Sequence, residues 1–153
     1  MRKLILLSVA MLLASCAQAP RNVPPPQSLL PPILVKPGFV RISAQSHYYA
    51  DINSVWVDNE HKNLIHFDAV INLTKGPHVY EDLTKYAKSM RQAKVVNCES
   101  HELTHLHTDY YSEFWGEGER VSPKKQRERR VMLQRGSSLY ILSQVLCVNL
   151  YQN

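Results

Sequence analysis

Five consecutive residues, His101-Glu102-Leu103-Thr104-His105, spell the pattern H-E-x-x-H. In zinc proteases this pattern lies on a helix, where both histidines bind the metal and the glutamate acts as a general base. Here the neighbouring residues Thr108, Tyr110 and Tyr111 favour a β-strand, and no third ligand follows at a suitable spacing. We therefore predict that the pattern does not form a protease site.

On a strand, His101, His105 and His107 have the same parity and are expected to share a face. Three imidazoles on one face could hold a metal ion or a haem iron. The other interpretation is a solvated strand face without a ligand. No catalytic triad, carboxylate pair or phosphate-binding loop has a defensible spacing, so the sequence predicts no enzyme and no required cofactor.

Basic residues gather in two parts of the chain. The first group is spaced three residues apart and would share a helix face but alternate between the faces of a strand: Lys85, Lys88, Arg91 and Lys94. The second group lies within residues 124–130, Lys-Lys-Gln-Arg-Glu-Arg-Arg. This second group could bind lipid headgroups, acidic glycans or acidic protein surfaces, or it could be a solvated loop and edge strand.

The N-terminus has the pattern of a bacterial lipoprotein signal. Arg2 and Lys3 precede an apolar run over residues 4–13, and Leu13-Ala14-Ser15-Cys16 has the form of a lipobox. The run is too short for a membrane-spanning helix, which needs roughly 20 apolar residues. We predict removal of residues 1–15 and acylation of Cys16, with Ala17 directing the product to the outer membrane. The alternative is an ordinary cleaved signal.

Removal of this signal leaves one domain on a tether. Residues 16–37 hold most of the chain's nine prolines and predict a tether, either extended or disordered, with a reach of roughly 60 Å at about 3.1 Å per residue. Residues 38–153 form the predicted folded domain. The chain of 153 residues has a net charge of +5, which falls to +3 once Arg2 and Lys3 are removed. An exported protein with this charge is not expected to bind nucleic acid.

With Cys16 acylated, Cys98 and Cys147 remain as an even pair in an oxidising compartment. A disulfide between them is the expected state. A metal or redox pair is the alternative, but no CxxC spacing supports it.

Alternating and turn residues predict about six strands. Seven candidate segments could supply them, at residues 39–42, 48–49, 55–57, 65–73, 86–98, 103–111 and 130–133, with turns at residues 51–53 and a long turn at 116–123. The strand over residues 65–73 is expected to bury one face. Leucines at helical spacing, Leu139, Leu142, Leu146 and Leu150, predict a C-terminal helix capped by Ser137 or Ser138. The fold class is therefore α+β, an antiparallel sheet with this helix on one face.

The chain also resembles the surface-adhesin protein E family of Haemophilus-type bacteria. The resemblance runs from the lipobox through residues 38–147 and is carried by the following blocks: Val55-Trp56-Val57-Asp58-Asn59, His66-Phe67-Asp68-Ala69-Val70, Asn97-Cys98, Glu113-Phe114-Trp115-Gly116 and Pro123-Lys124-Lys125-Gln126. It implies an antiparallel sheet with a disulfide-bound C-terminal helix, in a dimeric cell-surface adhesin. It further implies binding of host vitronectin through residues 85–108 and of laminin and plasminogen through residues 39–66, and haem binding is attributed to the family.

Two departures from the family pattern matter. The family has two adjacent basic residues before Tyr86, where this chain has Thr84 and Lys85. The family also has other residues at the positions of His105 and His107. From the resemblance and the residue types we expect partners to contact seven residues: Lys85, Lys88, Arg91, Lys94, Tyr48, Tyr49 and Trp56. The alternative function is a haem- or metal-binding envelope lipoprotein.

Overall fold

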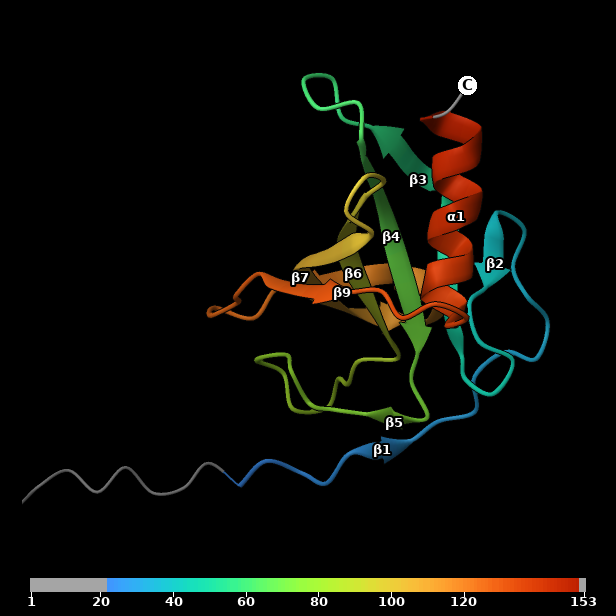
Figure 1. Ribbon diagram of the computed structural model, residues 1–153. Helices are drawn as coiled ribbons and strands as arrows, with labels where there is room; N and C mark the ends of the chain where they lie inside the picture. Colours follow the sequence, from blue (N-terminus) through green and yellow to red (C-terminus); the bar gives the residue numbers. More distant parts are fainter. Residues whose placement is uncertain (1–21, 152–153) are drawn as a thin grey trace, which may run out of the picture.

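The computed structural model describes residues 22–151, which form a seven-stranded antiparallel sheet with a helix packed on it and a separate two-stranded sheet of β1 and β5 (Figure 1). The strands of the larger sheet follow the order β2-β3-β4-β6-β7-β8, and β9 pairs with the other half of β7. The elements are β1 (Gln27–Ser28), β2 (Phe39–Arg41), β3 (Tyr48–Val57), β4 (Leu64–Asn72), β5 (Lys75–Gly76), β6 (Ser89–Asn97), β7 (Glu102–Glu113), η1 (Phe114–Gly116), β8 (Glu117–Val121), β9 (Arg129–Met132) and α1 (Ser138–Leu150). The predicted α+β class is confirmed.

Most strand predictions are confirmed, and three need correction. Residues 48–57 form the single strand β3, with a shift in register after Asp51, where a turn between two short strands was expected. Residues 117–121 form β8 rather than part of a long turn. Strand β6 begins at Ser89 rather than at Tyr86, because residues 77–88 form a loop.

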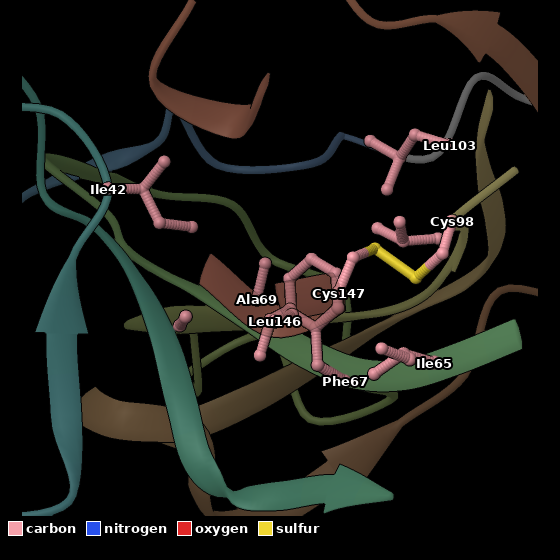
Figure 2. Packing of buried hydrophobic residues seen from close by; sticks show 10 residues of the cluster. Ile42, Ile65, Phe67, Ala69, Cys98, Leu103, Leu146 and Cys147 are labelled. Carbon is pink, nitrogen blue, oxygen red and sulfur yellow. A yellow bond between two sulfur atoms is a disulfide. The ribbon is translucent and has the colours of Figure 1, made fainter. Parts of the chain in front are cut away.

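The helix α1 covers the first core on one face of the sheet (Figure 2). Ile65, Phe67 and Ala69 alternate along β4 and point toward Leu146 of α1, and all four are buried. Ser137 caps the helix by accepting a hydrogen bond from the backbone N–H of Tyr140. Leu150, the last residue of the predicted apolar stripe, is 43% exposed, so the packed stripe ends at Leu146.

A disulfide joins Cys98, just after β6, to Cys147 of α1, as predicted. It closes a loop with a sequence separation of 49 residues. In the chain-entropy model a loop of this length contributes about 4 kcal/mol of stability. The disulfide therefore fixes the helix on the sheet.

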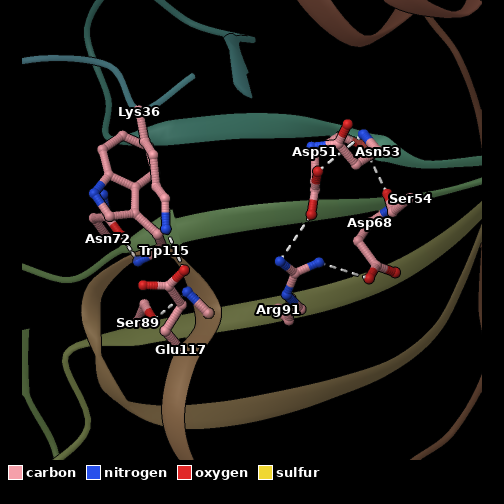
Figure 3. Close-up of polar contacts among 11 residues, drawn as sticks. Lys36, Asp51, Asn53, Ser54, Asp68, Asn72, Ser89, Arg91, Trp115 and Glu117 are labelled. Atoms are coloured by element: carbon pink, nitrogen blue, oxygen red, sulfur yellow. Dashed lines mark hydrogen bonds and ion pairs between the residues drawn. The ribbon is translucent and has the colours of Figure 1, made fainter. Parts of the chain in front are cut away.

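A second core covers part of the opposite face. The predicted buried face of β4 is confirmed, but the other face is partly buried as well, which was not predicted. Val70 and Asn72 point away from α1 and are buried. Trp115 of η1 packs there, with its ring centroid 4.7 Å from that of Tyr49, and its backbone N–H donates to Asn72 Oδ1 (Figure 3). Trp115 has a φ of 67°, a conformation costly for a bulky residue, and this packing holds it in place.

The described part of the tether lies against the domain rather than extending from it. Strand β1 pairs with β5, and Lys36 forms an ion pair with Glu117. Only residues before this docked segment can act as a free spacer, so the expected reach of roughly 60 Å is too long. Cys16 lies outside the described residues. Within residues 22–151, no helix is both long and apolar enough to cross a membrane.

Candidate functional site

The four basic residues predicted to bind a partner do not form one surface. Lys85 and Lys88 lie in or beside the loop before β6, where each pairs with a glutamate. The Lys85 Nζ atom lies 2.7 Å from Glu119, and the Lys88 Nζ atom lies 2.8 Å from Glu113. Exposed pairs of this kind contribute little stability and exchange readily with solvent, so both lysines remain available to an acidic partner.

Arg91, in contrast, is held inside the sheet by ion pairs. Its guanidinium lies between two carboxylates, 2.8 Å from Asp51 Oδ2 and 2.9 Å from Asp68 Oδ2 (Figure 3). Burial alone would lower the pKa of Arg91, but the hydrogen bonds to Asp51 and Asp68 outweigh it and the pKa is raised. These contacts join β3, β4 and β6. Gly116 permits them, because a Cβ atom there would lie 2.5 Å from Arg91 Nε.

Lys94 lies on the opposite face of β6 from Arg91, because the two are an odd number of residues apart in one regular strand. It is 7% exposed. Burial, followed by the charge of Arg129, lowers the pKa of Lys94 to about 8. Partner binding through Arg91 or Lys94 would therefore require side chains that the fold already encloses.

The three aromatic candidates also differ in exposure. Trp56 is 51% exposed and stacks on His66, with ring centroids 3.7 Å apart. Tyr48 is mostly buried, and this burial raises its pKa to about 12. Tyr49 is fully buried beneath Trp115. The expectation that Tyr49 contacts a partner must be corrected, because its side chain belongs to the second core.

The most open basic surface is the segment between β8 and β9. Every residue from 122 to 130 is exposed, and none of the ion pairs within residues 22–151 involves Lys124, Lys125 or Arg127. Gln126 holds the segment to the sheet, because its side chain accepts a hydrogen bond from the backbone N–H of Thr108. We call residues 122–128 the basic loop. The sequence suggests either a solvated loop or a binding surface for these residues, and their exposure in the structure is compatible with both.

The three histidines expected to share a face, His101, His105 and His107, do not all do so, because His107 points to the face away from α1. His101 lies in the turn before β7 with a φ of 56°. A β-bulge follows His105, so that Lys94 lies opposite His105 while Ala93 lies opposite His107. One additional residue in a bulge reverses the alternation of side chains, and His105 and His107 therefore point to opposite faces.

Residues 22–151 contain no group of three or more His, Cys, Asp or Glu side chains arranged to hold a metal ion. A pocket of about 690 Å³ lies where the loop before β6 meets β8 and the start of the basic loop, and Tyr80, Tyr110 and Glu119 contribute to its wall. Sequence reasoning missed this pocket because β8 was expected to be a turn. Tyr80 donates a hydrogen bond to the backbone carbonyl of Glu119, which joins the loop to β8.

Comparison with known proteins agrees with this architecture. A family model described as surface-adhesin protein E matches residues 39–148. Two relatives, both called surface-adhesin protein E, come from Haemophilus influenzae strains NTHi 3655 and Rd KW20. They are 43% and 42% identical over 150 residues, which covers 97% of this chain and 94% of each relative.

Solved structures are similar as well. The structure of Haemophilus influenzae protein E matches with a TM-score of 0.78 at 42% identity, covering 84% of this chain and 97% of that one. The crystal structure of protein E from non-typeable Haemophilus influenzae matches with a TM-score of 0.76 at 44% identity, covering 81% of this chain and 84% of that one.

Proposed function

The chain belongs to the surface-adhesin protein E family, and from this premise we propose that it is an outer-membrane lipoprotein that binds host proteins. Vitronectin, laminin and plasminogen are the proposed ligands, as the family resemblance implies. The proposed mechanism is non-covalent association without a catalytic step. A homodimer is the proposed assembly.

The observation that carries the proposal is the exposed Trp56 ring. Its indole is 51% exposed, yet it is held in place by stacking on His66. Tryptophan is enriched among residues that dominate protein–protein binding energies. A rigid aromatic side chain also loses little conformational entropy when a partner binds. Asp58, at the same hairpin, accepts hydrogen bonds from the backbone N–H groups of Glu60 and His61 and so fixes the hairpin that bears Trp56.

The electrostatic part of the proposed binding comes from exposed cations. These are Lys85 and Lys88, together with Lys124, Lys125 and Arg127 of the basic loop. The two lysines near β6 are balanced by glutamates, whereas no ion pair within the described residues balances the three in the loop. An acidic partner surface would gain most from the loop. Because exposed charges are screened within about 8 Å at physiological ionic strength, this contribution should fall as salt is added.

The proposed anchor places the domain close to the membrane. Cys16 is the proposed acylated residue, and several buried acyl chains make a durable anchor at roughly 0.8 kcal/mol per CH₂. The carbonyl of Pro25 already lies 3.2 Å from His78 Nε2. Pro25 follows Cys16 by nine positions in the sequence, a span of at most about 30 Å. The domain would therefore stand within a few tens of ångströms of the bilayer.

The proposal is tested by binding of the purified mature domain to immobilised vitronectin, laminin and plasminogen at several salt concentrations. We expect saturable binding to at least one ligand, with weaker affinity at high salt and after Lys124→Ala/Lys125→Ala substitution. Lys75→Ala, at an exposed position of β5 outside the proposed binding stretches, is the matched control for loss of a surface charge outside the loop. Absence of binding to all three ligands would contradict the proposed ligands, and binding that is insensitive to salt would contradict the electrostatic mechanism.

A further inference from the structure

A pocket of about 330 Å³ opens on the same face of the sheet as α1, beside the first turn of the helix. Leu103, Val131 and Leu139 form its apolar walls, and Gln92, Lys94, His105 and Arg129 contribute its polar groups. Its volume lies at the lower end of the range for small-molecule sites. It is separate from Trp56 and from the basic loop proposed to bind host proteins.

The strand register explains why three nitrogen bases meet in this pocket. Lys94 of β6 lies directly opposite His105 of β7, and His105 lies directly opposite Arg129 of β9. Side chains directly opposite each other on one face have Cβ atoms about 4.5–5.5 Å apart. On the other side of Lys94, β4 contributes the apolar Phe67. The row therefore contains two cations and an imidazole, with no carboxylate.

Lys94 lacks the partner that a buried cation normally has. It is 7% exposed, and none of the ion pairs within residues 22–151 includes Lys94 or Arg129. Buried charges are usually paired because desolvation is costly, and like charges across a strand pair are destabilising. Burial and Arg129 both lower the pKa of Lys94, with no neighbour that raises it.

His105 adds a hydrogen-bonding group. Its Nε2 atom lies 3.0 Å from the Thr108 hydroxyl, and its buried Nδ1 atom has no hydrogen-bond partner within the described residues. Burial, followed by the charge of Lys94, lowers the pKa of His105, so the imidazole is neutral at physiological pH. When Nε2 accepts from Thr108, Nδ1 carries the hydrogen and is an unused donor.

We propose that this pocket binds a small oxyanion, a phosphate or carboxylate group, between Lys94 and Arg129 with His105 as an additional donor. The anion supplies the counter-charge that the protein itself does not provide in the pocket. Charge-assisted hydrogen bonds to oxyanions are about twice as strong as neutral ones. This site is independent of the proposed adhesion, so either proposal can fail without the other.

The experiment is calorimetric titration of the mature protein with inorganic phosphate and, separately, with acetate, at pH 7 and constant ionic strength. We expect weak saturable binding of at least one anion. In Lys94→Met the affinity should fall by at least about tenfold, because this is the change in affinity that loss of one hydrogen bond to a charged group produces. Lys75→Met removes an exposed lysine of β5 and is expected to bind as the wild type does. Binding of phosphate alone or of acetate alone would support the site and identify the ligand class.

Lys94→Met keeps the length of the side chain and removes a buried charge, so it should fold, which a thermal melt verifies. Arg129→Gln, at an exposed position of β9, is the second variant and is also expected to bind more weakly. For acetate, whose charge does not change in this range, affinity for the wild type should fall between pH 7 and 9 as Lys94 loses its proton. Arg129 stays charged, His105 is already neutral, and Phe67 and Leu139 do not titrate. No saturable binding of either anion, or wild-type binding by both variants, would overturn the proposal.

Discussion

The indole of Trp56 and the imidazole of His66 stack across β3 and β4, with planes 9° from parallel and ring centroids 3.7 Å apart. The stack fixes an aromatic ring that is still half exposed. A side chain ordered before binding avoids a cost of about 0.5–1.5 kcal/mol when a partner immobilises it. This relationship makes Trp56 the best-prepared anchor among the proposed contact residues.

We predict that Trp56→Ala lowers affinity for the host protein by at least about tenfold, as expected for a binding anchor. The loss of stability should be smaller than the 3–5 kcal/mol typical of a buried aromatic residue, because half of the ring is exposed. Interferometry on immobilised vitronectin, laminin and plasminogen measures the affinity. Ile52→Ala, a 45% exposed position on the same strand, is the control. An equal effect of the two substitutions would remove Trp56 from the interface.

Arg91 should act on stability rather than on binding. Arg91→Gln leaves Asp51 and Asp68 without their shared cation, and we expect the free energy of unfolding to fall by about 3 kcal/mol. Urea denaturation measures this loss. Arg120→Gln, whose guanidinium is 64% exposed and 3.9 Å from Asp109, should cost less than about 1 kcal/mol. Equal losses in the two variants would show that the Arg91 contacts do not support the sheet.

The Cys98–Cys147 disulfide should dominate the attachment of α1. Replacing both cysteines with alanine is expected to lower the free energy of unfolding by about 2–5 kcal/mol. The melting temperature of the wild type should fall in reducing agent, whereas that of Cys98→Ala/Cys147→Ala should not change. A wild-type melting temperature that is insensitive to complete reduction would mean that packing of Leu146 and its neighbours holds the helix alone.

Lys94 should make stability depend on alkaline pH. Its pKa is lowered from 10.5 to about 8 in the folded state, chiefly by burial. Between about pH 8 and pH 10 the unfolded chain therefore binds more protons than the folded chain, and the free energy of unfolding should rise with pH, on the order of 2 kcal/mol. Below about pH 8 Lys94 is protonated in both the folded and the unfolded state. The free-energy cost of burying its charge is therefore at its maximum there and does not change with pH.

Urea denaturation from pH 7 to pH 10, in chloride buffers without oxyanions, checks this effect. The difference between wild type and Lys94→Met isolates Lys94 from other titrating groups. We expect the variant to be the more stable protein at pH 7 and the two to converge toward pH 10. A difference that stays constant with pH would mean that the lysine is protonated throughout.

Much of the fold could be predicted because its signals are local. The leucines of α1 recur at helical spacing, Phe67 and Ala69 alternate along β4, and Cys98 and Cys147 are the pair left after Cys16. What could not be predicted depends on contacts between distant segments. Whether the second face of β4 is buried depends on Trp115, which lies 43 residues beyond Asn72 and bonds to it.

The candidate site was less predictable for the same reason. Lys88 and Arg91 look alike in sequence, and only the positions of Asp51 and Asp68 on neighbouring strands make Arg91 structural. The bulge between His105 and His107 leaves no pattern in the sequence, yet because of it only His105 faces α1, whereas equal parity predicted that both share a face. The basic loop is the exception, because its charge could be read directly and the structure leaves it exposed.

We propose that this protein acts from the cell surface, and limited proteolysis of intact bacteria measures that exposure. Cells expressing the wild type should lose the folded domain to added protease and should adhere to immobilised host protein before that treatment. Cells expressing Cys16→Ala should release the protein or fail to display it. A wild-type domain that is protected on intact cells, but digested after the outer membrane is opened, would show that the protein faces the periplasm and does not bind host proteins.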